Sequence, residues 1–126
     1  MRKWFVGMCL LLSLTLMHTN ASAVLPNLSE VVIDYATSGD HTLIAGTAGK
    51  RIRVYRLFFF CNAATNVTIS DSTPTVIIPV MNILQSQGVS FGMSEIPYIV
   101  TGVGKDIVFN MSAAQQCSGR VWYNVN

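Results

Sequence analysis

The chain has 126 residues, which is enough for one hydrophobic core but not for two. Hydrophobic residues make up 51% of it and charged residues only 11%, a composition that excludes a disordered acidic or basic tail. The formal net charge of +2 comes from Arg2 and Lys3, because the six other basic residues balance the six acidic ones. A neutral domain lacks the positive field that binds phosphate backbones, so we expect no nucleic-acid partner.

Residues 1–23 have the layout of a secretory signal peptide. Arg2 and Lys3 give a basic start, an apolar run follows, and an A-x-A sequence ends the segment. The apolar run is shorter than the roughly 20 residues that a membrane-spanning helix needs. We therefore predict a cleaved signal, a single domain at 24–126, and export to the periplasm or the extracellular space with no membrane contact after cleavage. An uncleaved anchor or a buried helix is the alternative.

The domain begins with two predicted strands. Residues 31–36 (VVIDYA) and 41–45 (HTLIA) are apolar or β-branched over most of their length, and the turn residues TSGD separate them. Gly46 and Gly49 follow the second strand and mark a further turn. The short spacing favours antiparallel strands and leaves no room for a long helix here.

Residues 51–61 form the strongest predicted strand. Ile52 and Val54 alternate with arginine and tyrosine, and the alternation then gives way to the continuous apolar run LFFF. This pattern is typical of a strand with one solvent-facing side at its start and two covered sides at its end. We therefore expect a central strand whose core residues include Ile52, Val54, Phe58 and Phe60.

The rest of the domain continues with short strands and turns. The segment 75–78 lies between prolines, which predicts a short strand or an edge strand. Residues 81–86 are compatible with a strand or a helical turn. Other strands are predicted at 66–69, 89–91, 98–101, 106–111 and 120–125. Roughly eight or nine short strands with frequent turns indicate an all-β, antiparallel β-sandwich, jelly-roll-like in architecture.

Two cysteines, Cys61 and Cys117, remain after the signal segment. Export to an oxidising compartment makes a disulfide between them the first hypothesis. Such a bridge closes a long loop and contributes about 4 kcal/mol in the chain-entropy model. The alternative is a pair of buried free thiols that pack as small hydrophobic groups.

No complete catalytic or metal-binding motif is found. The G-x-S-x-G sequence at 88–92 has no histidine after it, and a serine hydrolase needs one. The sequence GVGK at 102–105 lacks the spacing of a phosphate-binding loop. His41 is the one histidine of the domain and does not make a metal site with scattered carboxylates. We therefore predict a non-enzymatic protein without cofactor or metal.

Five residues are candidates for a binding surface. Arg51 and Arg53 share one face of their predicted strand, where they would hold an acidic partner or a sulfated or phosphorylated glycan. Tyr98, Trp122 and Tyr123 are candidates for a sugar-stacking platform, although alternation places Trp122 and Tyr123 on opposite faces. The alternatives are a solvated strand face for the arginines and core packing for the aromatic residues.

The low number of charged residues bears on assembly. Natural sheet proteins often protect their edges with charged side chains, lysine above all, and this domain has only two lysines. One explanation is that other subunits cover its edges and faces. The alternative is a monomer whose surface consists of serine, threonine and asparagine.

Two segments carry a family resemblance. The first reads AGKRIRV at 48–54, followed by an apolar run and AATNVT at 63–68; the second reads TGVGKDI at 101–107, then NMSAA and SGRVWY. This order resembles a pattern in small virion-associated and tail-associated proteins of tailed phages. The resemblance implies a β-sandwich that serves as a structural or assembly protein, of tail or capsid-decoration type, and associates with itself or with other virion proteins. The alternative function is an exported module that binds a glycan or a cell-surface ligand.

Overall fold

The computed structural model describes residues 27–73 and 75–126, so the predicted signal at 1–23 lies outside the described residues. The described part of the chain forms strands and turns without any helix, and so holds no helix that is long and apolar enough to cross a membrane. Its strands are β1 (Ser29–Tyr35), β2 (Gly39–Ile44), β3 (Ile52–Cys61), β4 (Thr65–Asp71), β5 (Val76–Ile83), β6 (Gln87–Phe91), β7 (Ile99–Val100), β8 (Ile107–Met111) and β9 (Cys117–Val125).

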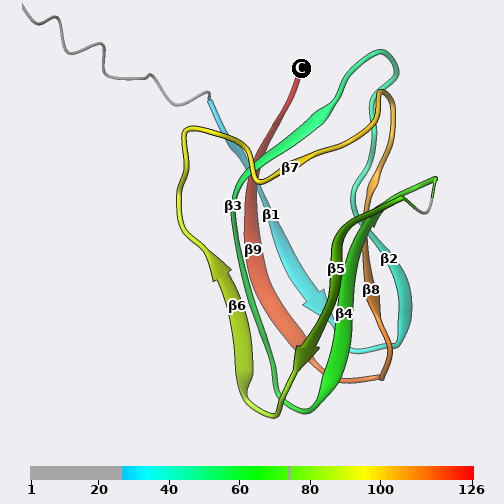
Figure 1. Ribbon diagram of the computed structural model, residues 1–126, viewed down its shortest axis with the longest axis vertical. Coiled ribbons are helices and arrows are strands. Elements are labelled where there is room, and N and C mark those ends of the chain that lie inside the picture. Colours follow the sequence, from blue (N-terminus) through cyan, green and yellow to red (C-terminus); the bar gives the residue numbers. More distant parts are fainter. Residues whose placement is uncertain (1–26, 74) are drawn as a thin grey trace, which may run out of the picture.

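These strands form two antiparallel sheets packed face to face (Figure 1). One sheet has the order β1-β9-β3-β6, with the short β7 paired to the start of β3, and the other has the order β2-β8-β4-β5. Apart from β4 and β5, the neighbours in each sheet are not consecutive strands of the chain. This strand order is that of a jelly roll, and it confirms the predicted all-β sandwich.

A β-bulge in β3 decides which side chains enter the core. The register of β3 on β9 shifts at Tyr55, which has no partner residue of its own. Ile52 and Val54 lie before the bulge and are buried, as expected. The prediction that Phe58 and Phe60 lie in the core is wrong, because the extra residue reverses the alternation of side chains after it. Phe58 is half-buried on the outer face, and the side chain of Phe60 is 54% exposed. The core positions after the bulge belong to Leu57, Phe59 and Cys61.

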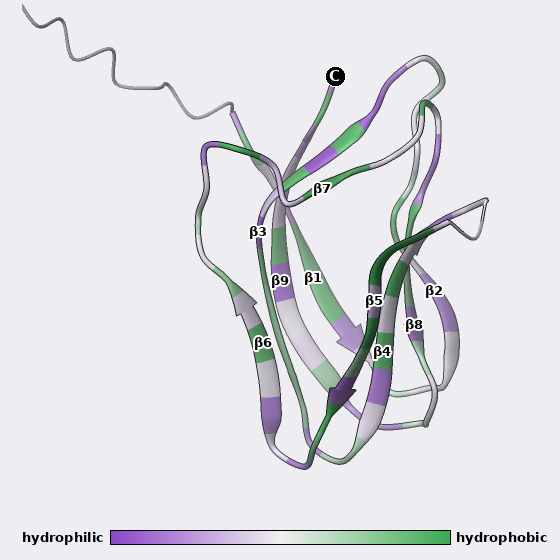
Figure 2. Cartoon of the chain, in the orientation of Figure 1, coloured by the Kyte–Doolittle hydropathy of each residue, from purple (hydrophilic) through white to green (hydrophobic). Residues whose placement is uncertain are grey.

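The core lies between the two sheets. Phe59 of β3 and Phe109 of β8 are both fully buried, and their rings meet edge to face with centroids 5.1 Å apart. Along β4 and β9, hydrophobic and hydrophilic residues alternate, as expected of strands with one face in the core and the other toward solvent (Figure 2). Strand β5 is hydrophobic over most of its length and contains Pro79, which is tolerated because β5 is an edge strand, as predicted.

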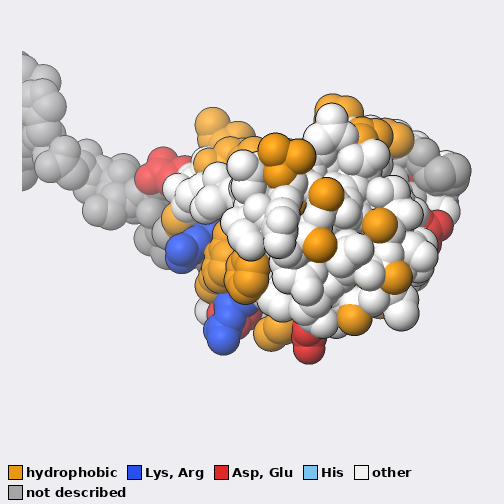
Figure 3. Space-filling model, turned by 90° about the horizontal axis from the view of Figure 1, so that it is seen from below, with side chains coloured by type: hydrophobic (Ala, Val, Ile, Leu, Met, Phe, Trp, Pro, Cys, Tyr) orange, Lys and Arg blue, Asp and Glu red, His pale blue; other side chains and the backbone are white. Residues whose placement is uncertain are grey.

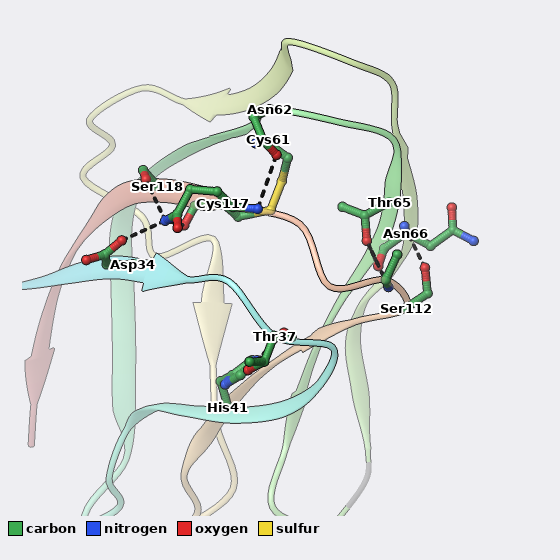
Figure 4. Close-up of a disulfide and its surroundings, with 12 residues drawn as sticks. Asp34, Thr37, His41, Cys61, Asn62, Thr65, Asn66, Ser112, Cys117 and Ser118 are labelled. Carbon is green, nitrogen blue, oxygen red and sulfur yellow. Dashed lines mark hydrogen bonds between the residues drawn. A yellow bond between two sulfur atoms is a disulfide. The ribbon is translucent and has the colours of Figure 1, made fainter.

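A disulfide joins the two sequence halves at one end of the sandwich. Cys61 and Cys117 are partners in the register of β3 on β9, and both are fully buried (Figure 4). Beyond the bridge, the backbone amide of Asn62 donates to the carbonyl of Gln116 at 3.0 Å, and the amide of Gln116 donates to the side-chain oxygen of Asn62 at 3.1 Å. The predicted bridge is therefore present and closes the end that carries the shorter loops.

Candidate functional site

The outward side of the sheet β1-β9-β3-β6 has an unusual composition for an exposed surface. We call it the aromatic face and define it by the outward positions of the register. These positions are Glu30, Val32 and Asp34 on β1, Ser118, Arg120 and Trp122 on β9, Arg56, Phe58 and Phe60 on β3, and Gly88 and Ser90 on β6. Viewed from below, one cluster of hydrophobic side chains lies between two groups of basic side chains, and other hydrophobic side chains are spread over the rest of this view (Figure 3).

Trp122 lies at the centre of one row across this face. Its register partners are Glu30 on β1 and Arg56 on β3. The guanidinium of Arg56 lies 4.6 Å from the centroid of the indole, and the ring of Phe58 lies 5.9 Å from it. A cation–π contact of this kind contributes about 0.5–1 kcal/mol at an exposed site. One side of the indole is therefore occupied by Arg56 and is not free for another ligand.

Arg120 lies at the centre of the next row, between Val32 and Phe58. Its guanidinium forms an ion pair with Glu30, with 2.5 Å between nitrogen and oxygen. Both partners are well exposed to solvent, so the pair contributes little to stability. It does neutralise Arg120, so that the middle of the aromatic face carries no isolated charge.

Phe60 lies in the third row, between Ser118 and Gly88. On the other side of Ser118, the carboxylate of Asp34 accepts a hydrogen bond of 2.7 Å from the side-chain amide of Gln116. Shallow grooves run along both sides of Phe60, one toward β1 and β9 and one toward β6. Phe60 therefore stands out of the sheet surface as an apolar projection.

A glycine on each strand that flanks β3 allows a close approach of the backbones. A Cβ atom at Gly119 would overlap the carbonyl oxygen of Phe58, and one at Gly88 would overlap the carbonyl oxygen of Phe59. Only glycine allows β9 and β6 to approach β3 this closely. Gly88 is the outward neighbour of Phe60, so the surface on the β6 side of Phe60 is backbone without a side chain, whereas Gly119 is the neighbour of the buried Phe59.

The sequence-predicted binding residues do not come together as one surface. Trp122 belongs to the aromatic face, whereas Tyr123 points inward and packs against the core, in agreement with the alternation. Tyr98 lies in the loop before β7 and its ring contacts Phe91, with centroids 5.3 Å apart. The ring contacts among the described residues therefore do not join these three aromatic side chains into a sugar-stacking platform.

The two predicted arginines have different surroundings. Arg51 precedes β3 at the end with the longer loops, where its guanidinium donates to the carbonyl of Thr101 at 3.1 Å. Arg53 lies on β3 opposite Asn124, and its Nε atom is buried without a hydrogen-bond partner among the described residues. Arg51 is exposed to solvent, whereas Arg53 is partly buried.

Of the residues of the aromatic face, Trp122 was the candidate that the sequence analysis named, and Phe58, Phe60 and Arg120 were not predicted as binding residues. Their grouping depends on the bulge at Tyr55, which leaves no recognisable signal in the sequence. The two glycines that flank β3 were the available hint, because glycine within a strand often marks a close approach of two backbones.

An acidic depression lies on the other sheet. Asp40, Asp71 and Asp106 line it. The hydroxyl of Thr73, and then the backbone amides of Thr73 and Thr75, donate to Asp71 and lower the pKa of its carboxyl, so this residue has a structural role in the β4–β5 turn. In residues 27–73 and 75–126 there is no group of three or more metal-ligating side chains placed to hold an ion.

The comparisons with known proteins found no relative. No family model, no curated protein and no solved structure matches the chain.

Proposed function

We propose that this protein is a non-enzymatic structural or assembly subunit, of a phage virion or a phage-derived surface assembly, that docks to neighbouring proteins through the aromatic face. The observation that carries the proposal is the composition of this face. Protein interfaces are enriched in aromatic residues and arginine at their centre and depleted of lysine. The aromatic face has Trp122, Phe58, Phe60, Arg56 and Arg120 and no lysine.

The fold and the sequence support the same function. Jelly rolls serve as capsid subunits and also as lectin domains, so the fold alone does not choose between them. The resemblance at 48–68 and 101–123 to small tail-associated and capsid-decoration proteins favours the structural role. The low content of charged residues fits a molecule whose surface is partly covered in an assembly.

The disulfide bears on where the protein works. Disulfides persist in oxidising compartments and are rare in the cytosol, so a buried bridge between Cys61 and Cys117 points to a non-cytoplasmic environment. We propose that the segment 1–23 directs export and that the bridge forms before the subunit docks.

The glycan-binding alternative stays a prediction with less support. Sugars stack on free aromatic faces, and the indole of Trp122 has the guanidinium of Arg56 over it at 4.6 Å. Tyr98 and Tyr123 lie elsewhere, so the residues proposed for that role do not form one surface.

Fractionation of an organism that carries the gene tests the proposal. Released particles and the cell-surface fraction are purified on a density gradient, and the protein is quantified by mass spectrometry against the other particle proteins. We expect a fixed ratio to those proteins. The Phe60→Ser variant should reduce incorporation, whereas Val80→Ser should not, because Val80 is equally exposed but lies on β5. Recovery of the wild type only as free protein would refute the assembly function.

A further inference from the structure

The row of the aromatic face through Trp122 carries a carboxylate on one side and a guanidinium on the other. From this arrangement we infer that its partner is a second copy of the same chain, related by a two-fold axis that runs parallel to β9 over Trp122. The inference rests on the proposed assembly function and specifies the partner and the contact. A two-fold contact uses the same patch on both subunits, so every residue must find a suitable partner within that patch.

The row through Trp122 carries the main argument. Glu30 lies on one side of Trp122 and Arg56 on the other, each as its direct register partner. Rotation by 180° about an axis along β9 exchanges the two sides of the row. Glu30 of one copy then faces Arg56 of the other, and the same pair forms a second time across the axis. The two indoles meet at the centre, where interface hot spots concentrate.

The next row is consistent with the same axis. Val32 and Phe58 lie on the two sides of Arg120, so the rotation places Val32 of one copy over Phe58 of the other. This contact buries Val32, whose side chain is 55% exposed in the single chain. The two Arg120 side chains approach each other, and the ion pair of each with its own Glu30 offsets their repulsion.

The balance of charge on the aromatic face argues against a partner that carries only positive or only negative charge. The face holds two arginines, Arg56 and Arg120, and two carboxylates, Glu30 and Asp34. A nucleic acid or an acidic glycan would meet the carboxylates, and a strongly basic surface would meet the arginines. A second copy supplies an arginine opposite each Glu30 and a carboxylate opposite each Arg56.

Pairing of copies through the sheet edge is a less favourable arrangement. If β1 paired with β1 of a second copy in antiparallel register centred on Val32, Glu30 would lie directly opposite Asp34. Like charges in opposite positions of two strands are destabilising. The carboxylates of β1 therefore disfavour edge pairing in this register.

A charge-exchange experiment tests the inference. The full chain is secreted so that its disulfide forms, and dissociation constants are measured by sedimentation equilibrium over a concentration series. We expect wild-type self-association, and a loss of about tenfold or more for Glu30→Arg alone and for Arg56→Glu alone, because each variant places like charges across the axis. A mixture of the two variants should associate more tightly than either variant alone, because in the mixed dimer each position 30 faces a position 56 of opposite charge across the axis.

Two further variants serve as controls. Glu95→Arg makes the same charge change in the exposed loop before β7 and should leave self-association unchanged. Phe60→Ser should weaken it. A strictly monomeric wild type, or a mixture no tighter than the separate variants, would overturn the inference. Neither result tests the assembly function, which the particle fractionation tests separately. A dimer that never enters particles would contradict the assembly function but not the two-fold contact.

Discussion

Neighbouring phenylalanines in β3 have opposite environments. Phe59 is 1% exposed and meets Phe109 in the core, whereas Phe60 is 54% exposed on the aromatic face. The bulge at Tyr55 determines which of the two is inside. The chemistry of a single residue therefore says little here about its role, because identical side chains contribute to stability in one position and to recognition in the next.

Alanine substitutions distinguish the two positions. Phe59→Ala should lower the free energy of unfolding by about 3–5 kcal/mol, because it leaves a cavity in the core. Phe60→Ala should change it by less than about 1 kcal/mol, as is usual for surface residues. Urea denaturation followed by tryptophan fluorescence measures both. Equal losses for the two variants would contradict the bulge.

The turn between β4 and β5 has a pH-sensitive residue, Asp71. Hydrogen bonds from Thr73 and Thr75 stabilise its carboxylate and lower its pKa below the ordinary value of 3.8. The folded state therefore binds this proton less readily than the unfolded chain. The stabilisation is fully present above about pH 4 and is lost as the pH falls through the lowered pKa.

We expect the melting temperature of the wild type to fall as the pH falls below about 4. In Asp71→Asn the carboxylate is absent, so the variant should be less stable at pH 7 and its melting temperature should depend less on pH in the acidic range. Thermal unfolding followed by circular dichroism across this range compares the two. Parallel curves for both proteins would show that Asp71 is not responsible.

At the scale of the elements, the close approach of β9 and β6 to β3 depends on glycine. A side chain at Gly119 or Gly88 would overlap the backbone of β3. The sheet would have to open there, at the base of Phe58 and Phe60. Gly119 therefore determines the packing of β9 on β3 beside the buried Phe59, and Gly88 determines the shape of the groove between Phe60 and β6.

Gly119→Ala should destabilise the fold by about 1–3 kcal/mol, the usual cost of forcing an extra methyl group into a packed site. Gly92→Ala is the matched control, because nothing lies within 4 Å of the position that its Cβ would take, and it should leave the free energy of unfolding unchanged within about 0.5 kcal/mol. Chemical denaturation of the two variants measures both free energies of unfolding. An unchanged Gly119→Ala protein would disprove the close strand contact.

At the scale of the whole molecule, the jelly-roll order brings the two halves of the chain together in one sheet. Strands β3 and β9 are direct neighbours although Cys61 and Cys117 are 56 residues apart. Contacts at this separation form only after a large loss of chain entropy. The disulfide reduces that entropy in the unfolded chain and so favours this distant pairing.

Removal of the bridge should therefore be costly. The variant with both Cys61→Ala and Cys117→Ala should lose about 2–4 kcal/mol of unfolding free energy.

Intact mass spectrometry should give a wild-type mass about 2 Da below that of the reduced protein, since bond formation removes two hydrogens. Equal masses before and after reduction would exclude the bridge.

The sequence by itself determined the fold class and the candidate cysteine pair. Frequent turn residues and short apolar runs predict an antiparallel sandwich, because these signals are local in the chain. The positions of Ile52 and Val54 in the core and the opposite directions of Trp122 and Tyr123 also follow from simple alternation. Cys61 and Cys117 were the available pair after the signal segment, and the structure decided between a bridge and two free thiols.

Only the tertiary structure decided which surface is available for a partner. One unpaired residue at Tyr55 reverses the alternation in β3, and Phe58 and Phe60 move from the predicted core to the aromatic face. The pairing of β3 with β9 and of β9 with β1 then places Arg56, Trp122 and Glu30 in one row. A bulge and a long-range strand order depend on contacts between distant segments, and no local pattern of residues encodes them.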